Sequence, residues 1–216
     1  MAIDRANWRA PTPQRVVDPA RSDRVVHAVG GSLVLQAPAY AAVRAAIDAF
    51  VAPGPPLAVE VGFDHGINLL AHARHFPGWR WLGVELRRHR VAAVADNAPP
   101  NCFALRLDGR TLFAAVLPPG RVQRVDILFP TPVVKAGHAI FTAAFVADLA
   151  RCVADHGVVR IVTDVPALDA VVCRLFAAWT PVAPPPRTVD LSRRERVCLR
   201  DGVPFVERAF RPAAGG

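Results

Sequence analysis

Short apolar runs alternate along the chain with segments of helical periodicity. The apolar runs predict strands, and each is followed by a segment whose apolar residues recur every three or four positions. The predicted strands are 57–61, 80–85, 102–107, 124–129 and 158–163. The predicted helices are about 67–75, about 88–96, a short one after the third strand, one with Phe141, Phe145, Leu149 and Cys152 on one face, and one opened by Pro166. This alternation predicts an α/β fold, a Rossmann-like doubly wound and mostly parallel sheet with helices on both faces.

The N-terminal part departs from this alternation. Residues 1–38 are interrupted by prolines and carry scattered arginines, which predicts an irregular basic arm. From Ala39, the stretch AYAAVRAAIDAFVA places Val43, Ile47 and Val51 at four-residue spacing. This spacing predicts a helix, which the following PGPP stretch ends.

The C-terminal part also departs from it. APPPR, at 183–187, is typical of a connector, and about 188–200 and 203–210 predict a C-terminal antiparallel strand pair. The chain is therefore expected to comprise the basic arm, 1–38, and a single domain, 39–216.

Length and composition favour one globular domain. A chain of 216 residues can bury a sizeable core, and 52% of its residues are hydrophobic. No apolar stretch approaches the ~20 uninterrupted residues that a membrane-spanning helix needs. The N-terminal stretch MAIDRANWRAPTPQR lacks the apolar core of a signal peptide. We expect a soluble, cytoplasmic protein without a membrane partner, either a monomer or a homodimer.

The basic charge allows two interpretations. The net charge of +8 and the pI of about 10.8 would suit a surface that attracts phosphate backbones. Lys135 is the only lysine, however, and the other basic residues are arginines in a chain rich in alanine, valine and proline. A compositional bias would give the same charge, so both interpretations stay open.

Residues that could bind a metal are dispersed. No C-x-x-C pair occurs among the cysteines, which are Cys102, Cys152, Cys173 and Cys198. This spacing favours buried reduced thiols over a metal site or disulfides. His72 and His75, with His65 nearby, are expected on the exposed part of a short helix as solvated side chains. The sequence therefore predicts no metal ion.

The residues that end the first three strands form an ordered set, and ligands of such sheets bind beyond the carboxyl ends of strands. In VEVGFDHG, Gly62 and Gly66 would let a ligand approach the backbone and the next helix. Glu85 ends the second strand, where a carboxylate can accept two ribose hydroxyl hydrogens. Asp108 follows the third strand and could accept from an exocyclic amine. With Glu60 in the first strand, these residues predict a nucleoside cofactor site.

Two nucleoside cofactors compete for this site. A nicotinamide dinucleotide favours G-x-G-x-x-G, which places the pyrophosphate at a helix N-terminus. The loop here reads G-F-D-H-G. A carboxylate is a poor neighbour for a pyrophosphate but a tolerable one for the sulfonium and amino group of S-adenosylmethionine, which the sequence therefore favours.

Six motifs together resemble the tRNA (guanine-N7-)-methyltransferase family of class I S-adenosylmethionine-dependent methyltransferases. They are VEVGFDHG, GVELRRH, LDG after the third strand, ILFPTPVVKAGH, VRIVTD and LSRRER, in that order. The family pattern runs E-I-G-F-G-x-G, G-x-E, D-A, F-P-D-P-W-x-K-x-R-H, T-D and T-x-x-E. The resemblance covers about 57–210.

The resemblance implies S-adenosylmethionine as the cofactor and a set of site residues. The matches to the family's cofactor contacts are Glu60, Gly62, Gly66, Glu85 and Asp108, and the neighbours expected to line the same site are Phe63, Leu86, Gly109 and Phe129. The matches to positions around the target base or its nucleotide are Lys135, His138, Asp164, Ser192 and Glu195, with serine in place of threonine. Asp164 and Glu195 could each accept a hydrogen bond from a guanine-like N–H edge.

The departures from the family pattern concern catalysis. Thr131, our candidate catalytic residue, replaces the aspartate of F-P-D-P, Val133 replaces the tryptophan, and Asp64 replaces the second glycine of the loop. Guanine N7 carries a lone pair and no proton, so its attack on the methyl group needs no base. The aspartate would instead stabilise the methylated ring by about 1.5–3 kcal/mol, the scale of a charged hydrogen bond. Thr131 cannot supply that charge.

The basic run that follows in the family is also reduced. Lys135 and His138 remain, and an apolar AIFTAAF stretch comes next. The sequence therefore ranks a purine-like or pteridine-like small heterocycle, methylated on a ring nitrogen, as the first substrate. A tRNA guanine is the alternative, and a non-catalytic family member that binds RNA or a protein is a further alternative.

Overall fold

The computed structural model of the chain describes residues 41–131, 140–186, 189 and 192–213. The predicted arm, 1–38, lies outside the described residues, as do Lys135 and His138. None of the described helices is both long enough and apolar enough to cross a bilayer.

The described helices and strands alternate along the chain. The strands are β1 (Leu57–Val61), β2 (Arg80–Val84), β3 (Cys102–Leu105), β4 (Val122–Leu128), β5 (Val153–Thr163), β6 (Thr180–Pro181) and β7 (Val206–Arg211). The helices are α3 (Ala41–Val51), α4 (Ile67–His75), α5 (Arg88–Ala95), α6 (Gly109–Thr111), the π-helical η4 (Leu112–Val116), α7 (Ala143–Cys152), α8 (Pro166–Leu175) and α9 (Arg193–Asp201).

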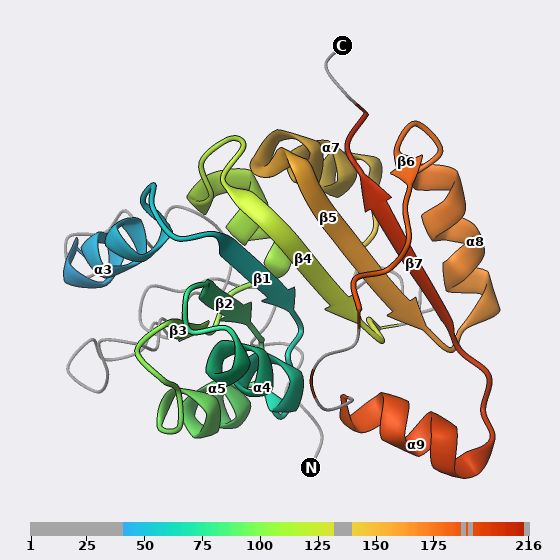
Figure 1. The fold of residues 1–216 in the computed structure, drawn as a ribbon, viewed down its shortest axis with the longest axis horizontal. Helices are drawn as coiled ribbons and strands as arrows, with labels where there is room; N and C mark the ends of the chain where they lie inside the picture. The colour runs from blue at the N-terminus through green and yellow to red at the C-terminus, as the bar shows by residue number, and fades with distance from the viewer. Residues whose placement is uncertain (1–40, 132–139, 187–188, 190–191, 214–216) are drawn as a thin grey trace, which may run out of the picture.

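These strands form one seven-stranded sheet in the order β3-β2-β1-β4-β5-β7-β6 (Figure 1). β1 to β5 are parallel, and β7 runs antiparallel to both β5 and β6. The order reverses between β1 and β4, and at this point the glycine loop, 62–66, connects β1 to α4. The prediction of a Rossmann-like, mostly parallel sheet with antiparallel C-terminal strands is confirmed.

The position of the antiparallel pair is a correction to the prediction. Within 188–200, which we expected to be a strand, the described residues from Arg193 onward form α9. Ser192 and Glu195 explain the helix because they form a capping box, in which each side chain accepts from the other residue's backbone N–H. The antiparallel partners of β7 are therefore β5 and the two-residue β6.

Two hydrophobic cores lie on opposite faces of the sheet, as the alternation of β1 shows. Leu57, Val59 and Val61 belong to the larger core, which packs against α3, η4, α7 and α8. Ala58 belongs to the smaller core with α4 and α5, and Glu60 lies on that same face. The smaller core thus covers the side of β1 that carries a buried carboxyl group.

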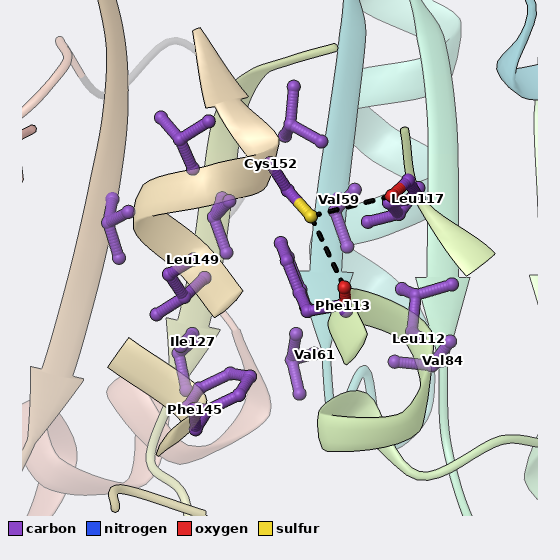
Figure 2. Packing of buried hydrophobic residues seen from close by; sticks show 14 of the residues in the cluster. Val59, Val61, Val84, Leu112, Phe113, Leu117, Ile127, Phe145, Leu149 and Cys152 are labelled. Atoms are coloured by element: carbon purple, nitrogen blue, oxygen red, sulfur yellow. Dashed lines mark hydrogen bonds between the residues drawn. The ribbon is translucent and has the colours of Figure 1, made fainter. Parts of the chain in front are cut away.

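Figure 2 shows the larger core where α7 meets η4. The thiol of Cys152 points at two carbonyl groups, one in η4 and one directly after it, with Sγ 3.3 Å from the oxygen of Phe113 and 3.6 Å from that of Leu117. Burial raises the pKa of Cys152 to about 11, so the group stays a thiol. This agrees with the expected buried reduced thiols, although Cys173 is exposed and corrects that expectation at one position.

The histidine pair also needs a correction. His72 is buried, and its ring stacks on Trp81 with centroids 4.7 Å apart, whereas His75 is exposed. His72 faces the core because it lies on the same side of α4 as the buried residues Leu69 and Ala73. Within the described residues, no cluster of three or more His, Cys, Asp and Glu side chains could hold a metal ion.

Candidate cofactor and substrate site

Two adjoining cavities lie beyond the carboxyl ends of the parallel strands. The β2–β3 cavity, of about 380 Å³, is lined by residues that include Gly62, Glu85, Leu86, Asp108, Gly109 and Thr131. The α9 cavity, of about 420 Å³, is lined by residues that include Glu60, Phe63, Asn68, Asp164, Ser192 and Arg193. The two share Gly62, Arg87, Leu128, Phe129 and Pro130. An elongated ligand could therefore occupy both.

Glu85 at the end of β2 is surrounded by donors. Its Oε1 accepts from the backbone N–H groups of Leu86 at 2.8 Å and Arg87 at 3.0 Å, and its Oε2 accepts from that of Asp64 at 3.1 Å. The Arg87 guanidinium adds Nε at 3.1 Å and Nη2 at 3.2 Å. A carboxylate offers about four acceptor positions, so ribose hydroxyl groups would have to displace a donor. Arg87, whose side chain is 37% exposed, is the partner free to move.

Asp108 is held in a similar way at the start of α6. Its Oδ1 accepts from the backbone N–H of Arg110 at 2.8 Å, and the Arg110 guanidinium reaches Oδ2 at 2.6 Å. The carboxylate caps the helix and lines the β2–β3 cavity. It is therefore fixed in position before a ligand arrives.

The two glycines of the loop, Gly62 and Gly66, have different structural roles. Gly62 has φ of +76°, and a Cβ placed on it would meet no atom within 4 Å, so any side chain would project into open space beside both cavities. Gly66 has φ of +71°, and a Cβ there would come within 2.3 Å of a methyl carbon of Val94. Gly66 lines neither cavity and is explained by the packing of α4 against α5, so its predicted cofactor contact stays a prediction.

Asp64, the replacement of the second family glycine, adopts the left-handed conformation with φ of +50°. Aspartate tolerates this conformation better than most residues. Its Oδ1 accepts from Arg87 Nη2 at 2.8 Å and lies 3.5 Å from Arg90 Nη1. The Asp64 side chain thereby joins the loop to the arginine that covers Glu85.

Glu60 lies at the floor of the α9 cavity and is 2% exposed. Its Oε2 accepts from Asn68 Nδ2 at 2.9 Å. Burial, with a smaller contribution from Asp126, raises the pKa of Glu60 to about 8 despite that hydrogen bond. Glu60 is therefore mainly a neutral carboxylic acid at pH 7.

Phe129 stands at the boundary of the two cavities. It has φ of +49°, an uncommon conformation for a bulky residue, while its N–H donates to the carbonyl of Val162 at 2.7 Å. Its ring packs edge-on against Phe205 with centroids 5.8 Å apart. Thr131 follows two residues later, is exposed, and lines the β2–β3 cavity. Its catalytic role stays a prediction.

The predicted substrate residues separate into two groups. Asp164 and Ser192 line the α9 cavity, and Asp164 Oδ2 accepts from Nε of Arg194 at 3.0 Å. Glu195 is 1% exposed and lines neither cavity. It accepts from the backbone N–H of Ser192 at 2.9 Å and lies 3.7 Å from Nη2 of Arg160. A contact between Glu195 and a base would therefore require α9 to move.

The rim of the α9 cavity is cationic. Arg193 and Arg194 line it from the first turn of α9. Arg193 Nη1 lies 2.8 Å from Nε2 of His65, and because a guanidinium can only donate, that ring nitrogen accepts. Burial lowers the pKa of His65, and nearby arginines lower it further, which agrees with a neutral ring. The cavity thus combines an acidic floor with arginines at its mouth.

Sequence reasoning missed the residues that hold the site acids. Asn68 could have been suspected, because it lies eight residues after Glu60 in the first turn of the next helix. Arg87 directly follows the Glu85–Leu86 pair, but no sequence pattern indicates that its side chain folds back onto Glu85 and Asp64. Such contacts depend on the loop geometry.

The site fits S-adenosylmethionine on the evidence of its donor set and its shape. Glu85 and Asp108 would hold the ribose and the adenine in the β2–β3 cavity, and the bare backbone at Gly62 leaves room for the ligand. The cationic amino acid end would then lie toward the α9 cavity and Glu60. The carboxyl groups that line the two cavities suit a cofactor that carries positive charge.

Solved structures of methyltransferases share this fold. The 16S rRNA methyltransferase KamB aligns with a TM-score of 0.59 and 13% identity over 78% of this chain and 93% of its own. The 16S rRNA (adenine(1408)-N(1))-methyltransferase from Catenulisporales acidiphilia aligns with a TM-score of 0.56 and 18% identity, over 80% and 94%. At such low identity, these matches establish the fold alone.

Sequence comparisons identify the family. A family model described as "Putative methyltransferase" matches residues 55–183, more than half of the chain. A tRNA (guanine-N(7)-)-methyltransferase from Leifsonia xyli is 35% identical over 125 residues, which is 55% of either chain, so this chain matches only about half the length of that relative. One from a Synechococcus strain is 31% identical over 171 residues, 70% of either chain. The predictions of a methyltransferase and of S-adenosylmethionine as its cofactor are confirmed at the level of the family. The chain belongs to the tRNA (guanine-N(7)-)-methyltransferase family of class I S-adenosylmethionine-dependent methyltransferases.

Proposed function

We propose that this protein transfers a methyl group from S-adenosylmethionine to N7 of a guanine in tRNA. The names of the relatives support this substrate, which was the alternative from the sequence, better than the small heterocycle that the sequence ranked first. Cytoplasmic localisation remains part of the proposal.

The observation that carries the proposal is the composition of the α9 cavity. Asp164 could accept from the N–H edge of a guanine, and Arg193 and Arg194 at the rim could bind the phosphates of its nucleotide. A free heterocycle would need a closed and mostly apolar pocket with few polar anchors. Carboxylates together with exposed arginines suit a base that is still attached to a phosphate backbone.

The chemistry requires mainly orientation. When bound, S-adenosylmethionine would supply an electrophilic methyl group for the lone pair of N7, and the residues of the site would contribute positioning and exclusion of water. Thr131 carries no charge, so stabilisation of the cationic product ring would fall to Asp164 in the α9 cavity. Phe129 and Pro130, which line both cavities, would lie at the junction between the nucleoside of the cofactor and the substrate.

The test is incorporation of labelled methyl groups into bulk tRNA that lacks this modification, beside a panel of free purines and pteridines. We expect labelling of a tRNA guanine that falls steeply as the salt concentration rises, because each phosphate contact adds to the salt dependence. Labelling of free heterocycles alone would restore the small-molecule substrate. Binding of tRNA without labelling would support the non-catalytic alternative.

A matched pair of variants tests the cavity. Asp164→Ala should lower turnover and leave cofactor affinity nearly intact. Asp169→Ala is the control, since Asp169 also pairs with an arginine, Arg208, but lies on α8 and lines neither cavity. Equal turnover in the two variants would move the base pocket elsewhere.

A further inference from the structure

The carboxyl group of Glu60 has no cationic partner in the part of the chain that the structure describes. Among the described residues, no arginine or histidine lies within 4.0 Å of it, and the hydrogen bond from Asn68 is the contact that holds it. The side chain is nevertheless buried, and Glu60 lines the α9 cavity. A buried carboxylate without a cation is costly.

The charged groups around Glu60 are already paired with one another. Asp126 in β4 is its direct neighbour across the sheet, because the two residues are Cα partners in the register of β1 and β4. Arg124 pairs with Asp126 at 2.9 Å and lies 3.1 Å from Nε2 of His72. His72 adds no positive charge, since burial and then Arg124 lower its pKa to about 4.

Arg160, the other nearby cation, also pairs with carboxyl groups other than that of Glu60. Arg160 in β5 is the register partner of Asp126, but its Nε lies 2.5 Å from Oε1 of Glu207 and its Nη2 lies 3.7 Å from Oε1 of Glu195. Glu60 and Asp126 therefore have one nearby guanidinium group between them, that of Arg124, because Arg160 pairs with Glu207 and Glu195. An additional positive charge at Glu60 would balance these two carboxyl groups.

We propose that Glu60 is a carboxylic acid in the free protein and gives up its proton when the cationic amino group of the cofactor enters the α9 cavity. The O–H proton passes to the buffer, and the ammonium group takes its place beside the new carboxylate, so the net charge at this position is zero both before and after binding. The proposal rests on the cofactor assignment and is independent of the RNA substrate. Asp126 is the positioning residue, because its negative charge makes ionisation of Glu60 harder until a cation arrives.

The proton can be counted by titration calorimetry of the full chain in buffers of different ionisation enthalpy. At pH 6.5, where an α-amino group is still cationic, S-adenosylmethionine or its demethylated product should release about one proton per ligand bound. 5′-Methylthioadenosine, which keeps the nucleoside and lacks the amino acid, should release none. The Kd for S-adenosylmethionine should fall about tenfold for each pH unit from 5.5 to 7.5.

Variants test whether the released proton comes from Glu60. Glu60→Gln should abolish the release and the pH dependence of Kd, and Asp126→Asn should shift the midpoint of the release to lower pH. Asp169→Asn, on α8 and outside both cavities, should behave as the wild type. If the buried substitutions prevent folding, the two ligands compared on the wild type still decide the question.

Three results would overturn the proposal: no proton released by S-adenosylmethionine, an equal release by 5′-methylthioadenosine, or a release that persists in Glu60→Gln. Absence of any cofactor binding would overturn it together with the cofactor assignment. A protein that releases the proton but does not methylate tRNA would keep this proposal and refute the RNA substrate. Methylation of tRNA without proton release would do the reverse.

Discussion

Glu85 and Glu60 make an informative pair, because both are buried glutamates of neighbouring parallel strands at the same edge of the sheet. Glu85 accepts five hydrogen bonds, three of them from backbone N–H groups. Among the described residues, Glu60 accepts one hydrogen bond, from the side chain of Asn68. Burial of Glu60 thus favours a carboxylic acid, whereas Glu85 is held by donors from the backbone and from Arg87.

The difference comes from a shift of two positions in the register of β1 and β2, because Glu60 is the partner of Gly83. Glu85 follows the last residue of β2, where the chain turns and its next N–H groups are free to point at the carboxylate. Glu60 lies inside β1, where the neighbouring N–H groups belong to ladders with β2 and β4. Only side chains or a ligand can therefore compensate its burial. The backbone therefore supplies donors to Glu85, whereas Glu60 has the side chain of Asn68 and space for a ligand.

The largest effect is expected at Glu85. Glu85→Ala should weaken binding of S-adenosylmethionine by roughly 1.5–3 kcal/mol, the scale of a charged hydrogen bond, because the ribose loses its acceptor and Arg87 loses its partner. Titration calorimetry measures the change, with Asp169→Ala as the control. An unaltered Kd would show that Glu85 does not bind the cofactor. The comparison with Glu60 would then no longer concern two residues of one site.

The next effect is the pH dependence of stability. Glu60 has a folded pKa of about 8, above its ordinary value of 4.5, so its stabilisation is present at low pH and is lost as the pH rises toward 8. His72 has a folded pKa of about 4, below its ordinary 6.5, so its stabilisation is present at high pH and is lost as the pH falls from 6.5. From these two groups, the free energy of unfolding should be nearly constant from pH 4.5 to 6.5 and fall by about 1.2 kcal/mol from pH 6.5 to 8.

Urea denaturation at half-unit pH steps measures this profile. Glu60→Gln should remove the fall above pH 6.5 and uncover the opposite slope of His72 below it. A variant that keeps the same decline above pH 6.5 would show that another group titrates there.

A smaller effect is expected at Ser192, whose neighbour Glu195 resembles Glu85 in accepting from the backbone. Ser192→Ala removes one half of the capping box and should lower the free energy of unfolding by about 1 kcal/mol. Ser192 also lines the α9 cavity, so turnover on tRNA should fall while cofactor affinity is kept. Ser192→Asp, which retains a capping oxygen, is the control, and loss of stability in it too would contradict the capping explanation.

The smallest effect is expected at Asp64. Asp64→Gly relieves the cost of the left-handed conformation but removes the half-exposed ion pair with Arg87. These two contributions are of similar size, so the free energy of unfolding should change by less than about 0.5 kcal/mol. A large loss of cofactor affinity in this variant would mean that the loop carboxylate itself contacts the ligand.

The sequence by itself determined the order of strands and helices from 57 to 175 and the family. Periodic apolar residues fix these elements locally, and the acids that end or follow strands, Glu85 and Asp108, reach the same edge in any parallel sheet. It did not predict α9, since 188–200 lacks a long apolar stripe and its helix depends on the capping box and on the burial of Glu195 and Cys198.

Tertiary structure alone decided the charge states and pairings. Whether His72 faces water or Trp81 depends on how α4 lies on the sheet, and the isolation of Glu60 depends on Arg124 and Arg160 being paired elsewhere. These choices involve residues far apart in the chain, and their energies depend on burial that no local pattern reveals. The sequence could therefore name the acids of the site, while the fold decided which of them carries a proton.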